Sequence, residues 1–302
     1  DQARAEAERA GLPVLIKARA GGGGRGIRLV EKIEDVERAF LAARAEARTA
    51  FGDGVYLEKY LTRVKHVEVQ VMGDQEGNMV CLGERDCSVQ RKHQKLIEES
   101  PAPTVSPGLR EELSRAATKA ARAVDYEGLG TIEFLLAQTG EFYFMEMNTR
   151  LQVEHPVTEM VSGVDLVKWQ IRIAAGVPMS FSQSDVRIRG HAIECRINAE
   201  NPAENFRPCC GRIELLHIPG GPWVRFDTAL YQGYQMPPYY DSMVGKLIVH
   251  AATRAEAVRK MRAALCEMVI EGIDHTGELQ QDLIGEDAFL DGRYTTSFLE
   301  ER

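Results

Sequence analysis

Hydrophobic and polar positions in the first sixty residues predict a small α/β unit. A helical pattern covers residues 1–10 and ends at Gly11, the residue type that most often caps a helix at its C-terminus. Short apolar runs at 14–17, 27–30 and 55–60 predict strands, and an Ala-, Glu- and Arg-rich segment of about 33–48 predicts a long helix between the last two. We expect these elements to fold together.

From residue 62 onward the pattern predicts more strands. Residues 66–72 alternate, 79–83 form a short apolar run, and the strands 131–137 and 141–145 flank a turn at Gln138-Thr139-Gly140. The helices of this part are predicted at about 108–124 and 165–175, the second starting at Asp165 and ending at Gly176. This part should therefore form a sheet with helices packed on it.

The last third of the chain continues the mixed pattern. Strands are predicted at 191–199, 211–217 and 245–251, and helices at about 253–270 and 276–290. We find no internal repeat and no low-complexity linker. The chain is therefore predicted to be α+β, in three sections of residues 1–61, 62–186 and 187–302 that pack on one another.

The hairpin at residues 131–148 carries the first chemical prediction. If its turn centres between Thr139 and Gly140, Glu133 falls directly opposite Glu146, and Asn148 projects from the same face as Glu146. The neighbouring residues are apolar, so we expect the hairpin to be buried on both faces. Two buried carboxylates that face each other need a shared proton or a cation, and these oxygen ligands suit Mg²⁺. The alternative is a pair of surface glutamates on a wet face.

The glycine run at residues 21–26 predicts a phosphate-binding loop. Gly21, Gly23 and Gly26 formally match G-x-G-x-x-G, but a strand follows the run, which excludes the dinucleotide-binding motif. No Gly-Lys-Ser/Thr follows either, which excludes a Walker A loop. Backbone N–H groups of glycines can approach phosphate closely, and Lys17 can add a charge. A purely structural exposed turn is the alternative, but ordering four consecutive glycines is entropically costly.

Two other charged segments carry little information by themselves. Residues 90–99 are dense in hydrogen-bond donors, and a run of this kind is usually a solvated face. Arg196 lies on an alternating strand, where it can be an ordinary salt-bridge residue.

Composition narrows the class of protein. The chain of 302 residues is 44% hydrophobic and 27% charged, which is ordinary for a soluble enzyme. Its net charge of −8 argues against a nucleic-acid-binding protein, and no segment has the length of a membrane span or the pattern of a signal peptide. The six cysteines show no zinc-binding spacing, as expected of reduced thiols in the cytoplasm. Because the sequence starts abruptly in a helical pattern, we expect it to be a piece of a longer protein.

Taken together, the motifs resemble those of the biotin carboxylase family of ATP-grasp enzymes. The resemblance covers nearly the whole chain, in order and at family-like spacing. The matching segments are residues 17–26, 58–61, 66–71, 84–95, 130–134, 146–159, 190–200 and 237–243.

The resemblance implies a fold and a set of roles. The fold would be an ATP-grasp lid (residues 1–61) and a larger antiparallel-sheet subdomain (62–186), followed by a biotin carboxylase C-terminal section (187–302). The family's preceding nucleotide-fold domain, with a further phosphate-binding lysine, is not part of this sequence. For ATP the implied residues are Lys17, Gly22, Gly23, Gly24, Gly26, Glu58, Lys59, Leu61, His66, Gln90 and His93. For Mg²⁺ or Mn²⁺ they are Glu133, Glu146 and Asn148.

The remaining implied residues concern bicarbonate and biotin. Bicarbonate would be bound by Lys95, Arg150, Gln152 and the backbone of Val153, with Glu154 as the base that deprotonates it. Arg150, four residues before Glu154, is expected to hold the anion and to lower the pKa of Glu154. Arg196 would stabilise the biotin enolate, which attacks CO₂ released from carboxyphosphate.

The resemblance also implies partners. The biotin would be carried by a biotin carboxyl carrier protein, with carboxyltransferase subunits acting next and a homodimer as the usual assembly. Acetyl-CoA carboxylase of fatty acid synthesis is the expected enzyme, although a separate carboxyltransferase selects the acceptor. No nucleic acid or membrane is expected as a partner.

Two alternatives remain. Another ATP-grasp ligase, such as a purine-pathway carboxylase or half of a carbamoyl-phosphate synthetase, would share the lid and the metal carboxylates but lack the set Arg150, Gln152, Glu154 and Arg196. A non-catalytic assembly module would bind Mg·ATP without bicarbonate-dependent turnover.

Overall fold

The computed structural model describes residues 2–19, 27–51 and 54–302. The chain divides into two compact units, Asp1–Arg63 and Val64–Arg302, which are described separately here. The glycines predicted to contact phosphate, Gly22, Gly23, Gly24 and Gly26, lie outside the described residues.

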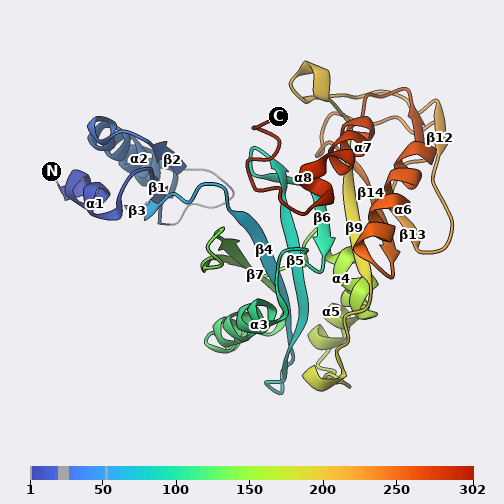
Figure 1. The fold of residues 1–302 in the computed structure, drawn as a ribbon, viewed down its shortest axis with the longest axis horizontal. Coiled ribbons are helices and arrows are strands. Elements are labelled where there is room, and N and C mark those ends of the chain that lie inside the picture. The colour runs from blue at the N-terminus through green and yellow to red at the C-terminus, as the bar shows by residue number, and fades with distance from the viewer. Residues whose placement is uncertain (1, 20–26, 52–53) are drawn as a thin grey trace. The chain divides into compact units, whose positions relative to one another are not determined.

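The first unit is a three-stranded antiparallel sheet with two helices (Figure 1). Its core consists of small and β-branched side chains, among them Ala7, Val14, Ile16 and Ala43. The strands and helices predicted in this part are confirmed. They are α1 (Gln2–Ala10), β1 (Val14–Ala18), β2 (Ile27–Val30), η1 (Ile33–Asp35), α2 (Val36–Phe51) and β3 (Val55–Lys59), with sheet order β2-β1-β3.

The second unit is built on one eight-stranded antiparallel sheet (Figure 1). Its order, β13-β14-β9-β6-β5-β4-β7-β8, places the strands from the middle and the last third of the chain side by side. The strands are β4 (Lys65–Gly73), β5 (Met79–Arg91), β6 (Gln94–Ser100), β7 (Gly128–Leu136), β8 (Phe142–Asn148), β9 (His191–Asn198), β13 (Val224–Thr228) and β14 (Met243–Ala251).

Helices and short strands complete this unit. The helices are α3 (Pro107–Arg122), α4 (His155–Ser162), α5 (Leu166–Ala174), α6 (Arg254–Glu267), α7 (Gly277–Gly285) and α8 (Asp287–Leu290), with 3₁₀ turns η2 (Gln183–Asp185) and η3 (Pro202–Glu204). The short strands are β10 (Glu200–Asn201), β11 (Arg207–Pro208), β12 (Leu215–His217) and β15 (Val269–Glu271).

Several predicted boundaries are wrong. β5 has 13 residues instead of the five expected at 79–83, and β6 runs through the segment interpreted as a solvated face. Both are inner strands, and Arg85, Asp86 and Glu98 are buried because each pairs with an opposite charge on another strand of the sheet. The predicted helix at 276–290 is two helices, with Glu286 between them, and α4, β13 and β15 were not predicted.

The two faces of the sheet have different chemistry. On one face, α3 packs on Val67, Val69 and Ile132, and α6 packs on the core that holds Ile193 and Leu247. On the other face, α4 packs against the strands next to Ala192 and Ile248. β4 is buried along its whole length, so its alternate residues His66, Glu68 and Gln70 form a buried polar row on the α4 face.

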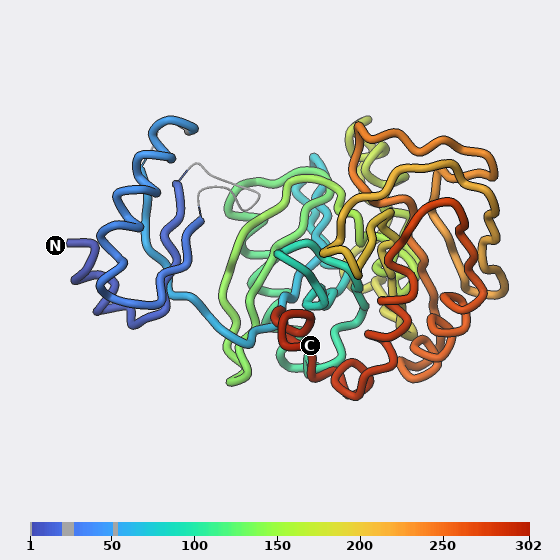
Figure 2. The backbone as a smooth tube through the Cα atoms, turned by 90° about the horizontal axis from the view of Figure 1, so that it is seen from above, coloured from blue at the N-terminus to red at the C-terminus, as the bar shows by residue number. Residues whose placement is uncertain are grey.

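The end of the chain returns to the sheet (Figure 2). A buried carboxylate of the sheet binds it there. Glu99 on β6 accepts hydrogen bonds from Nε2 of His191 at 2.5 Å, from Nε of Arg254 at 2.7 Å and from the hydroxyl of Tyr294. Burial opposes ionisation of Glu99, but His191 and Arg254 outweigh it and lower the pKa to about 2.

We expect Glu99→Gln to destabilise the fold in a pH-dependent way. Because the pKa of Glu99 is lower in the folded state, its contribution is present above the unfolded pKa of about 4.5 and is lost as the pH falls toward 2. The free energy of unfolding should fall by on the order of 3 kcal/mol at pH 7. Urea unfolding at pH 7 and at lower pH measures this, with exposed Glu111→Gln as the control; an equal loss at every pH would contradict it.

Candidate active site

The polar row on the α4 face extends over six strands of the sheet. Because alternate residues of a strand share a face, each strand contributes one to three polar side chains to this layer. They are His66, Glu68 and Gln70 on β4, Arg85 and Cys87 on β5, Glu98 on β6, Thr131 and Glu133 on β7, Glu194 and Arg196 on β9, and Lys246 on β14.

Arg85 lies at the centre of this layer and has no exposed surface. Its Nε donates to Glu68 at 2.6 Å, and its two terminal nitrogens donate to four further oxygen atoms. These acceptors are the side chains of Gln70 (2.8 Å), Thr158 (2.9 Å), Thr131 (3.2 Å) and Gln152 (2.9 Å). Every N–H of the guanidinium is thus used, which is what allows a charge of this kind to be buried.

Lys95 joins three carboxylates. Its Nζ lies 2.6 Å from Glu68 Oε2, 2.6 Å from Glu154 Oε1 and 3.0 Å from Glu133 Oε1. Burial by itself lowers the pKa of Lys95, but these carboxylates raise it well above its usual value. Burial likewise disfavours the charged form of Glu68, while Lys95 and Arg85 lower its pKa to about 2. Lys95 and Glu68 are therefore ionised at neutral pH.

Glu154 is held between two cations at the start of α4. Its side chain is almost fully buried, with Oε1 on Lys95 and Oε2 3.0 Å from a terminal nitrogen of Arg196. Nε of Arg196 donates to Glu98 at 2.6 Å. A carboxylate with two fixed cations beside it is in place to bind or deprotonate a small polar molecule.

The segment before Glu154 is held from both sides. Lys246 on β14 donates to the carbonyl oxygen of Val153 at 2.8 Å. Gln152 donates to Glu133 Oε1 at 2.8 Å, and its own carbonyl oxygen lies 2.7 Å from Nδ1 of His155. These contacts fix the backbone on which Glu154 stands, because they bind it to inner strands of the sheet.

The predicted pairing of Glu133 with Glu146 is confirmed, but the predicted turn position is wrong, since a register shift between Glu133 and Phe134 leaves the pairs nearer the turn one residue off. The predicted burial of the hairpin is not confirmed. Glu133 pairs with Glu146, and Glu133 is buried. The prediction that both faces of the hairpin are buried is wrong, since Phe144 is 60% exposed and Glu146 is exposed. β8 ends the sheet, while α3 packs on β4 and β5 and α5 packs on β7, so the outermost strand has less cover.

The oxygen atoms that this hairpin offers as metal ligands fit a magnesium ion. Mg²⁺ prefers hard oxygen ligands. Glu133 and Glu146 are cross-strand partners and offer two carboxylates. Asn148 offers an amide oxygen from a position two residues along the same strand as Glu146, opposite Thr131. Only one side-chain hydrogen bond is made to Glu146, from Asn148 at 3.3 Å, within the described part of the chain. Its remaining lone pairs are available to a cation.

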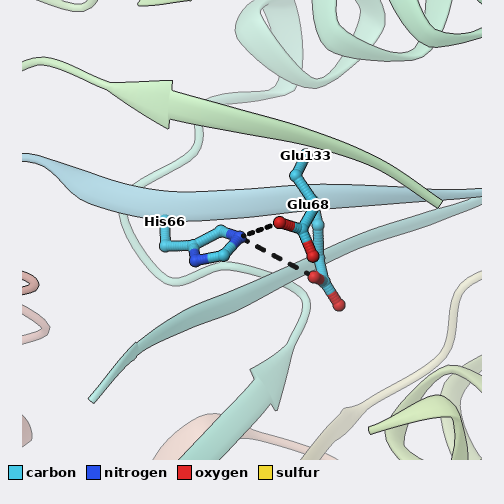
Figure 3. Close-up of side chains that lie close together, drawn as sticks. All are labelled: His66, Glu68 and Glu133. Carbon is cyan, nitrogen blue, oxygen red and sulfur yellow. Dashed lines mark ion pairs between the residues drawn. The ribbon is translucent and has the colours of Figure 1, made fainter. Parts of the chain in front are cut away.

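Two other groups of potential metal ligands are already paired with the ammonium group of a lysine. His66, Glu68 and Glu133 point toward one another, with Nε2 of His66 3.2 Å from Glu133 and 3.9 Å from Glu68 (Figure 3). The second group is Glu68, Cys87 and Glu154. The ammonium group of Lys95 contacts carboxylates of both groups, so we interpret them as parts of one ion-pair network.

The predicted nucleotide residues lie in both units. In the first unit Lys17 forms an ion pair with Glu58 at 2.6 Å, while Lys59 donates to the carbonyls of Gly11 and Leu12 after α1. Leu61 is half-buried. In the second unit, Gln90 is buried and donates to the carbonyl of Cys87, whereas His93 is exposed in the turn between β5 and β6.

Comparison with known proteins shows the family. Residues 1–182 match the model of the carbamoyl-phosphate synthase L chain ATP-binding domain, and residues 194–301 match the biotin carboxylase C-terminal domain. A biotin carboxylase of Nostoc is 55% identical over 292 residues, which cover 96% of this chain and 65% of that protein. The chain belongs to the biotin carboxylase family. A biotin carboxylase of Bacillus subtilis is 52% identical, with 99% of this chain and 67% of that protein covered.

Solved structures of biotin carboxylases have the same fold. The biotin carboxylase domain dimer of Hydrogenobacter thermophilus 2-oxoglutarate carboxylase, with MgADP, ADP and bicarbonate, is 49% identical with a TM-score of 0.94, covering 99% of this chain and 66% of that one. A Campylobacter jejuni biotin carboxylase complexed with β,γ-ATP is 49% identical with a TM-score of 0.93, covering 98% and 66%. The α+β fold with an ATP-grasp part and a biotin carboxylase C-terminal domain is thus confirmed. This chain spans about two thirds of these relatives. None of its described helices is long and apolar enough to cross a membrane.

One expectation about the biotin carboxylase motif is not supported by the geometry. Arg150 was expected to act on Glu154, but it is exposed and donates to Asn148 Oδ1 at 3.1 Å and to the carbonyl of Leu151 at 3.3 Å. Among the described residues, the ion pairs of Glu154 are formed with Lys95 and Arg196. The two residues lie in the non-helical segment between β8 and α4, where a separation of four residues does not bring side chains together as it does in a helix.

Sequence reasoning missed several members of this charged layer. Glu68, Arg85, Glu98, Glu194 and Lys246 were given no role. The available signal was the alternation of valines with polar residues at 66–71, which indicates a strand with a core face and a second polar face. The pairing of that polar face with other strands depends on the sheet order, which local pattern does not reveal.

Proposed function

We propose that this chain is the ATP-grasp and C-terminal part of a biotin carboxylase, which carboxylates biotin at the expense of ATP and bicarbonate. The observation that carries the proposal is Glu154, almost fully buried between Lys95 and Arg196. Family membership supports it, since the relatives are biotin carboxylases or carboxylase subunits.

In this proposal Glu154 is the base for bicarbonate. Bicarbonate is a poor nucleophile until it loses its proton, and Glu154, which lies between Lys95 and Arg196, would accept that proton. Lys95 and Arg150, together with Gln152 and the backbone of Val153, would bind the anion. Gln152 is held in position by Arg85 and Glu133, so its side-chain orientation is set before the substrate arrives.

The same proposal assigns ATP to residues of both units. Lys17 and the glycine run would bind phosphates, Glu58, Lys59 and Leu61 the adenine, and His66, Gln90 and His93 the rest of the nucleotide. Because Lys17 is paired with Glu58, binding would require the lysine to exchange that carboxylate for phosphate. Glu133, Glu146 and Asn148 would hold Mg²⁺ or Mn²⁺, which when bound neutralises phosphate charge.

Glu146→Gln tests the metal assignment without turnover. Removing one of the two carboxylate charges should weaken Mn²⁺ binding by at least about tenfold, as measured by electron paramagnetic resonance of free Mn²⁺ in the presence of ATP. Glu141→Gln is the matched control, because Glu141 is an exposed glutamate at the turn of the same hairpin. Equal Mn²⁺ affinity in both variants would remove Glu146 from the proposed ligands.

Biotin would be activated at Arg196. The guanidinium, fixed by Glu98 and Glu154, would stabilise the enolate formed when biotin loses its N1′ proton. The substrate would be biotin on a carrier protein, with carboxyltransferase subunits as later partners and a homodimer as the assembly. We place the protein in the cytoplasm, since the described cysteines are all free thiols. We propose acetyl-CoA as the final acceptor, with pyruvate and 2-oxoglutarate as alternatives that occur among the relatives.

Bicarbonate dependence of ATP hydrolysis tests the proposed function. Phosphate release should require bicarbonate and rise with free biotin, in the chain as given or in a longer form that includes the segment preceding it in its relatives. Binding of Mg·ATP with no response to bicarbonate in either form would contradict the proposal and favour the non-catalytic assembly module.

A further inference from the structure

Two glutamates face each other on inner strands of the sheet, and one of them accepts a hydrogen bond from Arg196. Glu98 on β6 and Glu194 on β9 are direct cross-strand partners, and neither has any exposed surface. Directly opposed residues have Cβ atoms about 5 Å apart, and like charges at that distance in a buried site repel strongly. The mechanism proposed above uses Glu98 as a partner of Arg196 and gives no role to Glu194 or to the pair as a unit.

The hydrogen bonds of the pair are incomplete. Glu98 Oε1 accepts from Nε of Arg196, but Glu98 Oε2 and both carboxyl oxygens of Glu194 have no hydrogen-bond partner among the described residues. An ionised carboxylate without donors is very costly to bury. If Glu194 is protonated, it gains an O–H donor next to an acceptor that needs one, and the missing hydrogen bond can form within the pair.

The charges around the pair lead to the same conclusion. The groups that act on Glu194 are Glu98, Lys246, Arg196 and Glu154. With Lys95 and Glu154 included, the lysines and arginines of the layer are Arg85, Lys95, Arg196 and Lys246. Their positive charges are matched by Glu68, Glu133, Glu154 and a single negative charge from the pair. Asp227 lies 3.8 Å from Lys246, but it is bound by Arg225 at 2.7 Å.

We propose that the Glu98–Glu194 pair shares one proton, carried by Glu194, and that its single negative charge on Glu98 positions Arg196 beside Glu154. Both glutamates are positioning residues in this proposal, since they act through Arg196. Burial raises the pKa of both carboxyl groups, and that of Glu194 lies well above its usual value, as expected for such a pair.

Infrared spectroscopy tests the shared proton without any activity. At about pH 7 ordinary carboxyl groups are ionised, so the C=O stretch of a protonated carboxylic acid should come from the pair. We expect this absorption in the wild-type protein and its loss in Glu194→Gln. Glu99→Gln is the matched control, because Glu99 is a buried glutamate next to Glu98 with donors on both oxygens, and it should leave the absorption unchanged. Absence of the absorption in the wild-type protein overturns the proposal, whether or not the variants fold.

The pH dependence of stability gives an independent test. A carboxyl with a raised folded-state pKa keeps its proton when the unfolded chain has ionised, so its contribution to stability falls as the pH rises above about 4.5. Glu194→Gln mimics the protonated acid and removes this fall. We therefore expect the difference between the urea midpoints of the variant and the wild type to shift in favour of the variant as the pH rises from 5 to 8. A midpoint that falls relative to wild type over this range would contradict the proposal.

The positioning part rests on the proposed biotin carboxylase function. Glu98→Gln removes the charge that holds Arg196, so we expect the KM for free biotin to rise about tenfold while the KM for ATP stays within twofold. If Glu98→Gln shifts both KM values equally, the positioning role is wrong. If no form turns over, the proposed function fails while the infrared result still decides the shared proton.

Discussion

Glu154→Gln should lower bicarbonate-dependent ATP turnover by about 10²- to 10⁴-fold. The amide has nearly the shape of the carboxylate but cannot accept a proton from bicarbonate. It also leaves Lys95 and Arg196 with less negative charge between them, because both contact this carboxylate directly. Since Lys95 retains Glu68 and Glu133, and Arg196 retains Glu98, we expect the fold to persist.

Steady-state phosphate release at saturating ATP and bicarbonate measures this effect. Exposed Glu111→Gln on α3 is the matched control and should keep wild-type turnover. Circular dichroism and the urea midpoint establish that the inactive variant is folded. Turnover within tenfold of wild type in folded Glu154→Gln would mean that another group accepts the proton.

Arg85→Met should cost about 3–5 kcal/mol of the free energy of unfolding. Methionine fills a similar length but has no donor, so Glu68 loses one of its two cations while remaining completely buried. The side chains of Gln70, Thr131, Gln152 and Thr158 lose a donor at the same time. These acceptors come from β4, from β7, from the segment before α4 and from α4 itself, so the loss affects distant parts of the charged layer.

Urea unfolding at neutral pH measures the cost. Arg115→Met on α3 is the matched control, because Arg115 is exposed, and it should stay within about 0.5 kcal/mol of wild type. A cost below about 1 kcal/mol in Arg85→Met would show that the buried guanidinium is not needed to hold the layer together.

The local elements could be predicted where apolar pattern and turn residues agree. The strand at 14–17, the hairpin of β7 and β8 and the helix that starts after Asp165 each follow from short-range rules for periodicity, turn residues and capping. These features depend on residues that are close together in the chain, which a single sequence displays directly.

The charged layer could not be predicted in this way. Glu98 was assigned to a solvated face because charged runs are usually exposed. In the structure its strand, β6, lies between β5 and β9. The cation that pairs with Glu98 is Arg196 on β9, 98 residues away in the chain. The exposure of Phe144 was not predicted for a related reason. Its strand, β8, is the last strand of the sheet, which local sequence does not reveal. Both errors concern sheet order, a long-range property.

Formation of carboxybiotin is the most direct test of the account. The protein, extended by the preceding segment if the chain alone is inactive, is incubated with ATP, Mg²⁺, labelled bicarbonate and free biotin, and acid-labile label on biotin is counted. We expect labelled biotin that requires ATP and is absent in Glu154→Gln. ATP hydrolysis that depends on bicarbonate but leaves biotin unlabelled in every form would contradict the assignment as a biotin carboxylase.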